Sequence, residues 1–229
     1  MNDTREFIDL SRRLRSALTP ADLDETLAKI TAAAVDVLPD VRYSSITIKH
    51  ADGRLETAAP THDFLIELDA AQYELREGPC YDAATDTVHV ASPHLVEDAR
   101  WPRYAPVAVA AGVQAQAGIR LFDSEESNGA LNLYAEKAGA FDDLTSLGEF
   151  FSHQAALAID YAREIDQLKQ AVATRQLIGQ AVGLVMHQYE LDDAHAFAFL
   201  TRLSSTSNTK LKTVAEQVVG EHNTRSRTD

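Results

Sequence analysis

Hydrophobic positions in the last third of the chain recur at the three- and four-residue spacing of a helix. This spacing holds from Phe141 to Tyr189 and predicts one nearly continuous helix. All seven prolines lie at or before Pro106, so no proline interrupts this stretch. A long helix is therefore expected to lead into the end of the chain.

Two shorter helices are predicted after the long one. Asp192 and Asp193 suit the positive end of a helix dipole, so they mark the start of a helix. The polar run 204–208 is expected to end it, and Asn208 or Thr209 to cap a third helix that stops at Gly220. Three helices with one apolar face each can bury a single small core. The apolar face of the middle helix is expected to contain Ala194, Phe197, Phe199, Leu200 and Leu203.

The first two-thirds of the chain follow a different pattern. Residues 43–50 and 55–58 flank the turn sequence Ala51–Asp52–Gly53, and the first of them alternates as a strand does, which predicts a hairpin. We expect a mixed α+β domain here. Its other strands are predicted over residues 87–91, 113–122 and 130–135, and its helices over residues 5–18, 19–38, 62–75, 80–85 and 106–111.

Composition narrows the class of protein. The chain has 229 residues, of which 45% are hydrophobic, so it is long enough for one large or two small domains with a real core. No apolar run approaches the roughly 20 residues that span a bilayer, and the charged N-terminus lacks a signal-peptide core. These features predict a cytoplasmic protein without membrane contact. Cys80 is the single cysteine, which excludes an intramolecular disulfide.

Charge is unevenly distributed along the chain. The formal net charge is −14, yet residues 170–229 hold six basic and six acidic residues, so the whole excess precedes them. An acidic first part repels stray nucleic acid, and a neutral last part has to bind it through a local patch and shape.

Three motifs in the last part carry a resemblance to a known family. IGQAVGLVM, AFAFLTRLSSTSN and KLKTVAEQVV fall on the three predicted helices. Together they resemble an ANTAR domain, an RNA-binding module of bacterial transcription antiterminators. One departure is Val182, where many members of that family carry a basic residue. This departure removes one expected phosphate contact.

The first part resembles a second family over about residues 20 to 160. The motifs are DAAQYELREGPCYDA (residues 69–83), Asp98–Ala99–Arg100–Trp101–Pro102, and GALNLYA (residues 129–135). In this order they resemble a GAF domain of the version fused to ANTAR domains in actinobacterial regulators. The resemblance implies an α+β sensor of small molecules, with an antiparallel sheet flanked by helices. The domains expected are an N-terminal helix (1–19), a GAF-like sensor (20–157), a coiled-coil linker (158–174), an ANTAR-like RNA-binding bundle (175–222) and a disordered tail (223–229).

Candidate RNA contacts cluster around the junction of the last two helices. Cationic side chains there can pair with phosphates, and an Asn amide can read a base in an unpaired loop. Small residues in the long helix let RNA or another helix approach its backbone. Without the resemblance, residue chemistry favours ordinary surface charge as the explanation of the lysines. The candidates are Arg202, Asn208, Lys210, Lys212, Ala181 and Gly183.

A short apolar stripe in the long helix has the spacing of a coiled coil. Its steps of three and four residues suit pairing with a second copy, so a homodimer is predicted. Arg175 occupies the next position and weakens any continuation. The alternative is that the stripe packs on the sheet of its own sensor domain. The expected dimer seam consists of Ala158, Tyr161, Ile165, Leu168 and Val172.

Two residues are candidates for a sensor pocket. Cys80 is either a redox-sensitive or ligand-lining thiol or a small buried residue. Trp101 either stacks on a ligand or fills a packing gap. The eight histidines show no metal-ligand spacing, and no nucleotide-binding or hydrolase motif occurs, so no catalytic residue, metal or cofactor is predicted. The ligand of the sensor is left open.

The leading hypothesis is a non-enzymatic regulator. The GAF-like domain senses a small-molecule or protein signal, and a dimeric ANTAR-like module binds paired hairpins in nascent RNA. By family analogy this binding stabilises an antiterminator. Two alternatives are a protein-interaction module with a degenerate ANTAR-like bundle, and a redox sensor acting through Cys80.

Overall fold

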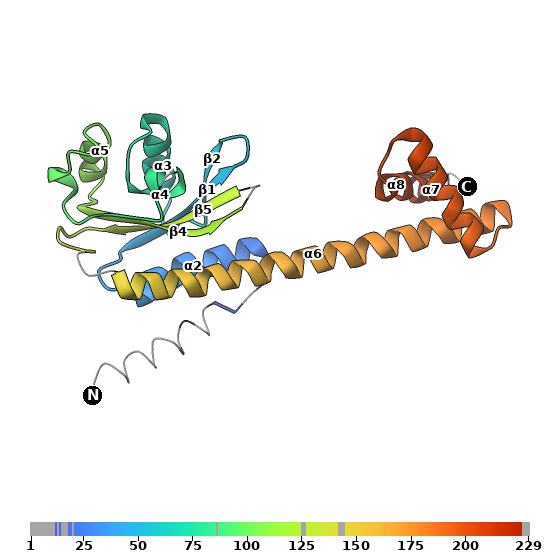
Figure 1. Cartoon of the computed structure of the whole chain (residues 1–229), viewed down its shortest axis with the longest axis horizontal. Helices are drawn as coiled ribbons and strands as arrows, with labels where there is room; N and C mark the ends of the chain where they lie inside the picture. The colour runs from blue at the N-terminus through green and yellow to red at the C-terminus, as the bar shows by residue number, and fades with distance from the viewer. Residues whose placement is uncertain are drawn as a thin grey trace. The chain divides into compact units, whose positions relative to one another are not determined.

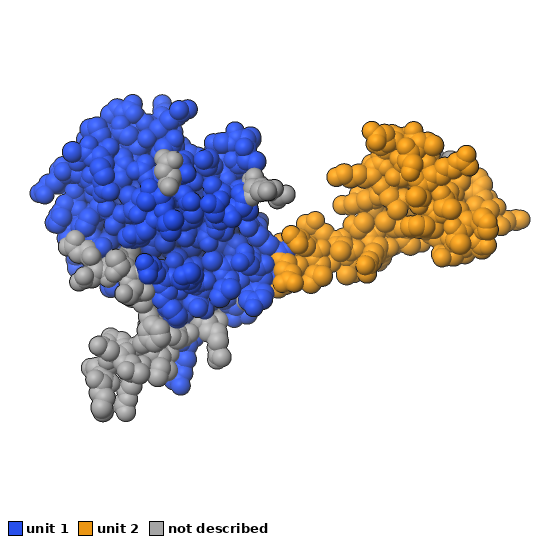
Figure 2. All heavy atoms as spheres, in the orientation of Figure 1, with its two compact units in different colours: residues 1–163 blue, residues 164–229 orange. Residues whose placement is uncertain are grey.

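The structure is a computed structural model, shown in Figure 1, and it describes residues 12, 14, 18–19, 21–85, 87–124, 127–141 and 145–225. It divides into two compact units, Met1–Arg163 and Glu164–Asp229 (Figure 2). The helix expected over residues 1–19 lies almost entirely outside the described residues, and so does the end of the tail expected over residues 223–229.

The first unit is built on a five-stranded antiparallel sheet with the strand order β2-β1-β5-β4-β3. The predicted hairpin forms β1 and β2, and β5 joins β1 to β4 at the centre of the sheet. The turn between β4 and β5 is shorter than expected, because β5 already begins at Ser127. The strands are β1 (Tyr43–His50), β2 (Leu55–Ala58), β3 (His89–Ser92), β4 (Ala115–Asp123) and β5 (Ser127–Ala135).

Helices cover both faces of this sheet (Figure 1). On one face lie α2 (Leu23–Val37) and the beginning of α6 (Thr145–Tyr189). Asp22 caps α2 by accepting a hydrogen bond from the Glu25 amide at 2.9 Å. The apolar core on this side includes Ile30, Ile46, Leu131, Leu133, Phe151 and Ile159.

The opposite face of the sheet carries α3 (Phe64–Leu75), α4 (Pro79–Thr85) and α5 (Tyr104–Ala110). A short 3₁₀ helix, η1 (Leu95–Glu97), lies between β3 and α5. Because strand side chains alternate between faces, the residues between the apolar ones point to this side. Several of them are polar and fully buried, namely Ser45, Thr47, Gln116 and Asn132.

The second unit contains the end of α6 with α7 (Asp193–Ser207) and α8 (Leu211–Arg225). Asp192 caps α7 by accepting a hydrogen bond from the His195 amide at 2.8 Å, as its position predicted. The three helices share one apolar core, as expected. Its buried members are Ala181, Val182, Val185, Ala196, Leu200, Val214 and Ala215.

The run 204–208 ends α7 as expected, at its last residues: the helix reaches Ser207, and Ser205, Thr206 and Ser207 donate their hydroxyls to carbonyls four residues earlier. Two other details of the predicted bundle are wrong. Gly220 does not end α8, which runs to Arg225. The apolar face of α7 is narrower than expected, since only Ala196 and Leu200 are buried. Phe197, Phe199 and Leu203 are each at least 40% exposed.

Candidate functional site

A buried carboxylate lies at the centre of the polar layer between the sheet and α3. Asp69 is fully buried and accepts hydrogen bonds from Ser45 Oγ at 2.8 Å, Thr57 Oγ1 at 3.2 Å and Gln72 Nε2 at 3.2 Å. The hydroxyl of Tyr134 donates to it as well. Burial raises the pKa of Asp69 to about 6, although these hydrogen bonds favour the charged form.

Cys80 belongs to the same buried layer. Its Sγ accepts a hydrogen bond from Gln116 Nε2 at 2.8 Å, and its amide donates to Gln72 Oε1 at 3.0 Å. Burial is the main cause that raises the pKa of the Cys80 thiol. A buried, protonated thiol is a poor nucleophile, so this environment argues against the redox alternative.

Asn132 is the one member of this layer with an unsatisfied atom. Its Nδ2 donates to Ser45 Oγ and Thr47 Oγ1, each at 2.9 Å, while its Oδ1 has no hydrogen-bond partner among the described residues. The four polar strand residues, together with Asp69, were not singled out from the sequence. The available signal was the alternation of polar and apolar residues within the motif GALNLYA and in strand β1.

Trp101 is 2% exposed and packs in the core beneath α3 and α5. Its indole Nε1 donates to Asp82 Oδ2 at 3.0 Å, and the Arg100 guanidinium lies 4.2 Å from the ring centroid. Arg100 also binds Asp98 at 2.6 Å, which lowers the pKa of Asp98 to about 2. Trp101 therefore fills a gap in the packing, which is the second of the two roles considered for it from the sequence.

The four polar RNA-contact candidates are exposed and follow one another across the junction of α7 and α8. Arg202 lies on the last turns of α7, and Asn208 ends that helix in the left-handed conformation with φ 50°. Asn208 thus caps the end of α7 and not the start of the third helix. Lys210 precedes α8, and Lys212 in its first turn lies 3.9 Å from Glu216.

The two small candidates in α6 have different surroundings. Ala181 is fully buried in the bundle core, so its small side chain serves close helix packing and does not face solvent. Gly183 is exposed, and a Cβ built on it would meet nothing within 4 Å. Val182 is only 6% exposed and also belongs to the core. In this fold the side chain at position 182 therefore contributes to packing.

Two family models match the chain, one on each unit. A GAF domain model matches residues 20–160, which is more than half of the 229 residues. The chain belongs to the GAF domain family. An ANTAR domain model matches residues 166–219. The chain thus combines a GAF domain with an ANTAR domain, which is the architecture of GAF-controlled ANTAR regulators. A search of curated proteins gave no match.

Solved structures share the fold of the GAF domain. The GAF domain of a phosphoenolpyruvate-protein phosphotransferase from Coxiella burnetii has a TM-score of 0.54 and 14% identity, covering 73% of this chain and 99% of its own. A LuxR family transcription factor dependent on N-acylhomoserine lactone, from Burkholderia cenocepacia, has a TM-score of 0.53 and 14% identity, with coverages of 72% and 99%. A free methionine-R-sulfoxide reductase from Neisseria meningitidis has a TM-score of 0.53 and 13% identity, with coverages of 68% and 89%. At these identities the likeness shows the fold alone.

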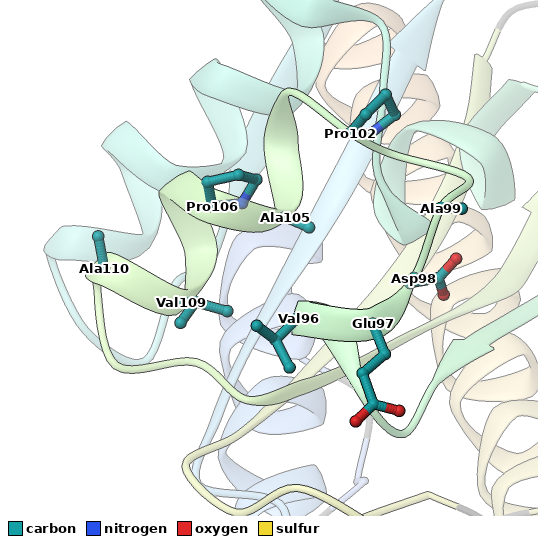
Figure 3. A pocket seen from close by; sticks show the side chains of 9 residues that line it. All are labelled: Val96, Glu97, Asp98, Ala99, Pro102, Ala105, Pro106, Val109 and Ala110. Atoms are coloured by element: carbon teal, nitrogen blue, oxygen red, sulfur yellow. The ribbon is translucent and has the colours of Figure 1, made fainter.

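The GAF domain has a surface pocket next to two of its short helices. It has a volume of about 620 Å³ and lies between η1, the Trp101–Pro102 loop and α5. Figure 3 shows Val96 and Val109 pointing toward one another across it, with Glu97 and Asp98 at one end. Its remaining lining is alanine and proline, so the pocket offers an apolar wall with an acidic end.

The expected dimer seam on α6 divides into two parts. Ala158 is 4% exposed and packs in the core of the GAF domain, as the alternative interpretation of the stripe had it. Tyr161, Leu168 and Val172 are at least 57% exposed, and Ile165 is half-buried. Leu157, which the sequence interpretation did not include, is 50% exposed and one turn before Tyr161. We call Leu157, Tyr161, Ile165, Leu168 and Val172 the α6 stripe.

Two further observations concern the described part of the chain only. Within it, no group of three or more His, Cys, Asp or Glu side chains is arranged to hold a metal ion. No helix among these residues is long and apolar enough to cross a membrane.

Proposed function

We propose that this chain is an RNA-binding regulator of transcription antitermination, in which the GAF domain controls a dimeric ANTAR module that binds paired hairpins in nascent RNA. The observation that carries the proposal is the exposed row of Arg202, Asn208, Lys210 and Lys212 at the junction of α7 and α8. Arg and Lys side chains bind phosphates, and the Asn amide matches the edge of an unpaired base.

The α6 stripe supports the dimer. Its exposed side chains recur at steps of three and four residues over 157–172, and burying them against a second copy removes apolar surface from water. A dimer carries two ANTAR modules. Two modules that engage two neighbouring hairpins bind far more tightly than one, provided that the spacing of the hairpins matches.

The signal for this regulator is assigned to the GAF domain. The pocket between η1 and α5 fits a molecule with an apolar body. At its acidic end Asp98 is already bound by Arg100, so the Glu97 carboxylate is the group that suits a positively charged or hydrogen-donating part of the molecule. The order of the motifs around Glu77–Cys80 and Gly129–Ala135 supports the actinobacterial type of GAF–ANTAR regulator. In this proposal the regulator acts in the cytoplasm and has no catalysis of its own.

The double variant Arg202→Ala, Lys210→Ala tests the RNA-binding surface. Removing two cations that bind phosphates is expected to weaken binding to a two-hairpin RNA by about tenfold or more at low salt. It is also expected to reduce the slope of log K against log salt by about 0.7 for each phosphate that is no longer bound. Binding is measured by fluorescence anisotropy, with a two-hairpin RNA that the full-length chain recovers from a pool with randomised loops.

The matched control removes two exposed cations from the GAF domain, Arg54→Ala and Lys137→Ala. It changes the net charge equally and should leave both affinity and salt slope at the wild-type values. Equal weakening by both double variants shows that bulk charge acts instead of this surface. If the wild-type chain retains no RNA at any salt, the protein-interaction alternative replaces the proposal.

A further inference from the structure

The ANTAR domain contains a second feature that the row of cations does not explain. A cleft of about 220 Å³ lies between the end of α6, the middle of α7 and the second half of α8. Two aromatic side chains form part of its wall. Tyr189 and Phe199 have ring centroids 5.4 Å apart and an interplanar angle of 38°, and they remain 51% and 41% exposed.

The polar lining of this cleft has a particular chemistry. Gln188, Gln217, Glu221 and His222 line it with hydrogen-bond donors and acceptors, and no lysine or arginine is among its lining residues. A phosphate finds no lysine or arginine among the residues that line the cleft. A flat, uncharged ring with polar edges matches the lining much better.

A cation lies close to the cleft without lining it. Arg202 follows Phe199 by three residues on α7, and residues three apart on a helix are surface neighbours. Both side chains are exposed. A nucleotide whose base contacts Phe199 therefore has its phosphate within reach of Arg202.

We propose that this cleft binds one unpaired base of the RNA loop, stacked on Phe199 and Tyr189, with an exocyclic amino group of the base donating to Glu221. The proposal rests on the proposed RNA-binding function and assigns a base-reading site to it. The row of cations holds the phosphates, and the cleft reads a base. This division explains how a module with balanced charge selects RNA, because aromatic stacking does not depend on net charge.

The chain offers a matched pair of variants for the test. Phe199→Leu removes a ring in the cleft that is 41% exposed, whereas Phe197→Leu removes a ring of similar exposure, 46%, that does not line it. The probe is the two-hairpin RNA recovered from the randomised pool, with 2-aminopurine placed at one unpaired loop position at a time. Stacking on an aromatic ring quenches the fluorescence of this base.

We expect the wild-type chain and Phe197→Leu to quench at least one loop position equally. Phe199→Leu and Tyr189→Leu are expected to lose that quenching and to bind about fivefold to tenfold more weakly, at an unchanged salt slope. Circular dichroism of each variant confirms that the bundle is intact. Substituting uridine, which has no exocyclic amino group, at the quenched position should weaken wild-type binding but not binding by Phe199→Leu.

Equal affinity and equal quenching for Phe197→Leu and Phe199→Leu overturn the base site and leave the aromatic pair as a surface for a protein. The same conclusion follows if the wild-type chain binds the RNA and no loop position is quenched. Failure of the wild-type chain to recover any RNA overturns the proposed function, and the base site with it.

Discussion

Asp69 is a fully buried carboxylate in the GAF domain. Its carboxylate is buried on a face where the nearest partners are hydroxyls and an amide, so it accepts hydrogen bonds without a cationic partner among them. Removing a carboxylate from water is costly, and the four donors offset this cost only in part. The raised pKa of Asp69, about 6, expresses that balance.

This balance predicts how stability depends on pH. Between about pH 4 and pH 6 the folded state holds a proton on Asp69 that the unfolded chain has already released, so stability falls as pH rises. A shift from 3.8 to about 6 corresponds to about 3 kcal/mol of unfolding free energy, lost by pH 7. Asp69→Asn is expected to abolish this loss.

The measurement is chemical denaturation of wild type and Asp69→Asn at several pH values. The difference between the unfolding free energies of wild type and Asp69→Asn isolates the contribution of Asp69. It cancels the contributions of other groups, including groups whose effect on stability changes with pH in the opposite direction. Asp98 is one of them, because its lowered pKa of about 2 makes its stabilising contribution present above pH 4 and lost as the pH falls. A difference that stays constant from pH 4 to pH 7 would contradict the assignment.

Helix α4 packs on the sheet at a position where a glycine allows the two elements to approach closely. A Cβ built on Gly118 in β4 would lie 2.6 Å from the Pro79 carbonyl oxygen and 2.7 Å from Ala83 Cβ. This close approach brings α4 directly onto the sheet and encloses the buried polar layer beside it. In contrast, a Cβ built on Gly220 in α8 meets nothing within 4 Å.

The two glycines therefore predict opposite effects of the same substitution. Gly118→Ala forces α4 away from the sheet and is expected to destabilise the GAF domain by about 1–3 kcal/mol. Gly220→Ala is expected to stabilise the ANTAR domain by up to about 1 kcal/mol, because alanine favours an exposed helix interior. Thermal unfolding of both variants checks the pair, and a stable Gly118→Ala variant would mean that α4 is loosely packed.

The sequence predicted elements well where periodicity alone decides, as in α2, the β1–β2 hairpin and the long α6. Prediction from the sequence failed where contacts with other elements decide which side chains are buried. Phe199 matched a buried stripe, but the core of three short helices covers only Ala196 and Leu200 on α7. The layer around Asp69 was missed because polar positions in a strand pattern normally indicate solvent, and only the packing of α3 and α4 shows that this face is enclosed.

The whole molecule is predicted to act as a dimer through the α6 stripe. Leu168→Glu with Val172→Glu places like charges on facing helices and should convert the dimer to a monomer in analytical ultracentrifugation. The control Lys169→Glu with Gln170→Glu adds charge to exposed positions beside the stripe and should leave the dimer intact. A wild-type chain that sediments as a monomer at all concentrations would contradict the predicted dimer.

Helix α6 runs without a break from the core of one domain into the core of the other. No residue of α6 between Ala162 and Ala181 is buried. The middle segment of this stretch is the thirteen residues from Glu164 to Gln176. An isolated helix of about 12–15 residues is only marginally stable in water. In a single chain this middle segment is helical because both ends are already fixed, so amide hydrogen exchange should be fastest there. Opening of a few turns would uncouple the two domains while each keeps its own core.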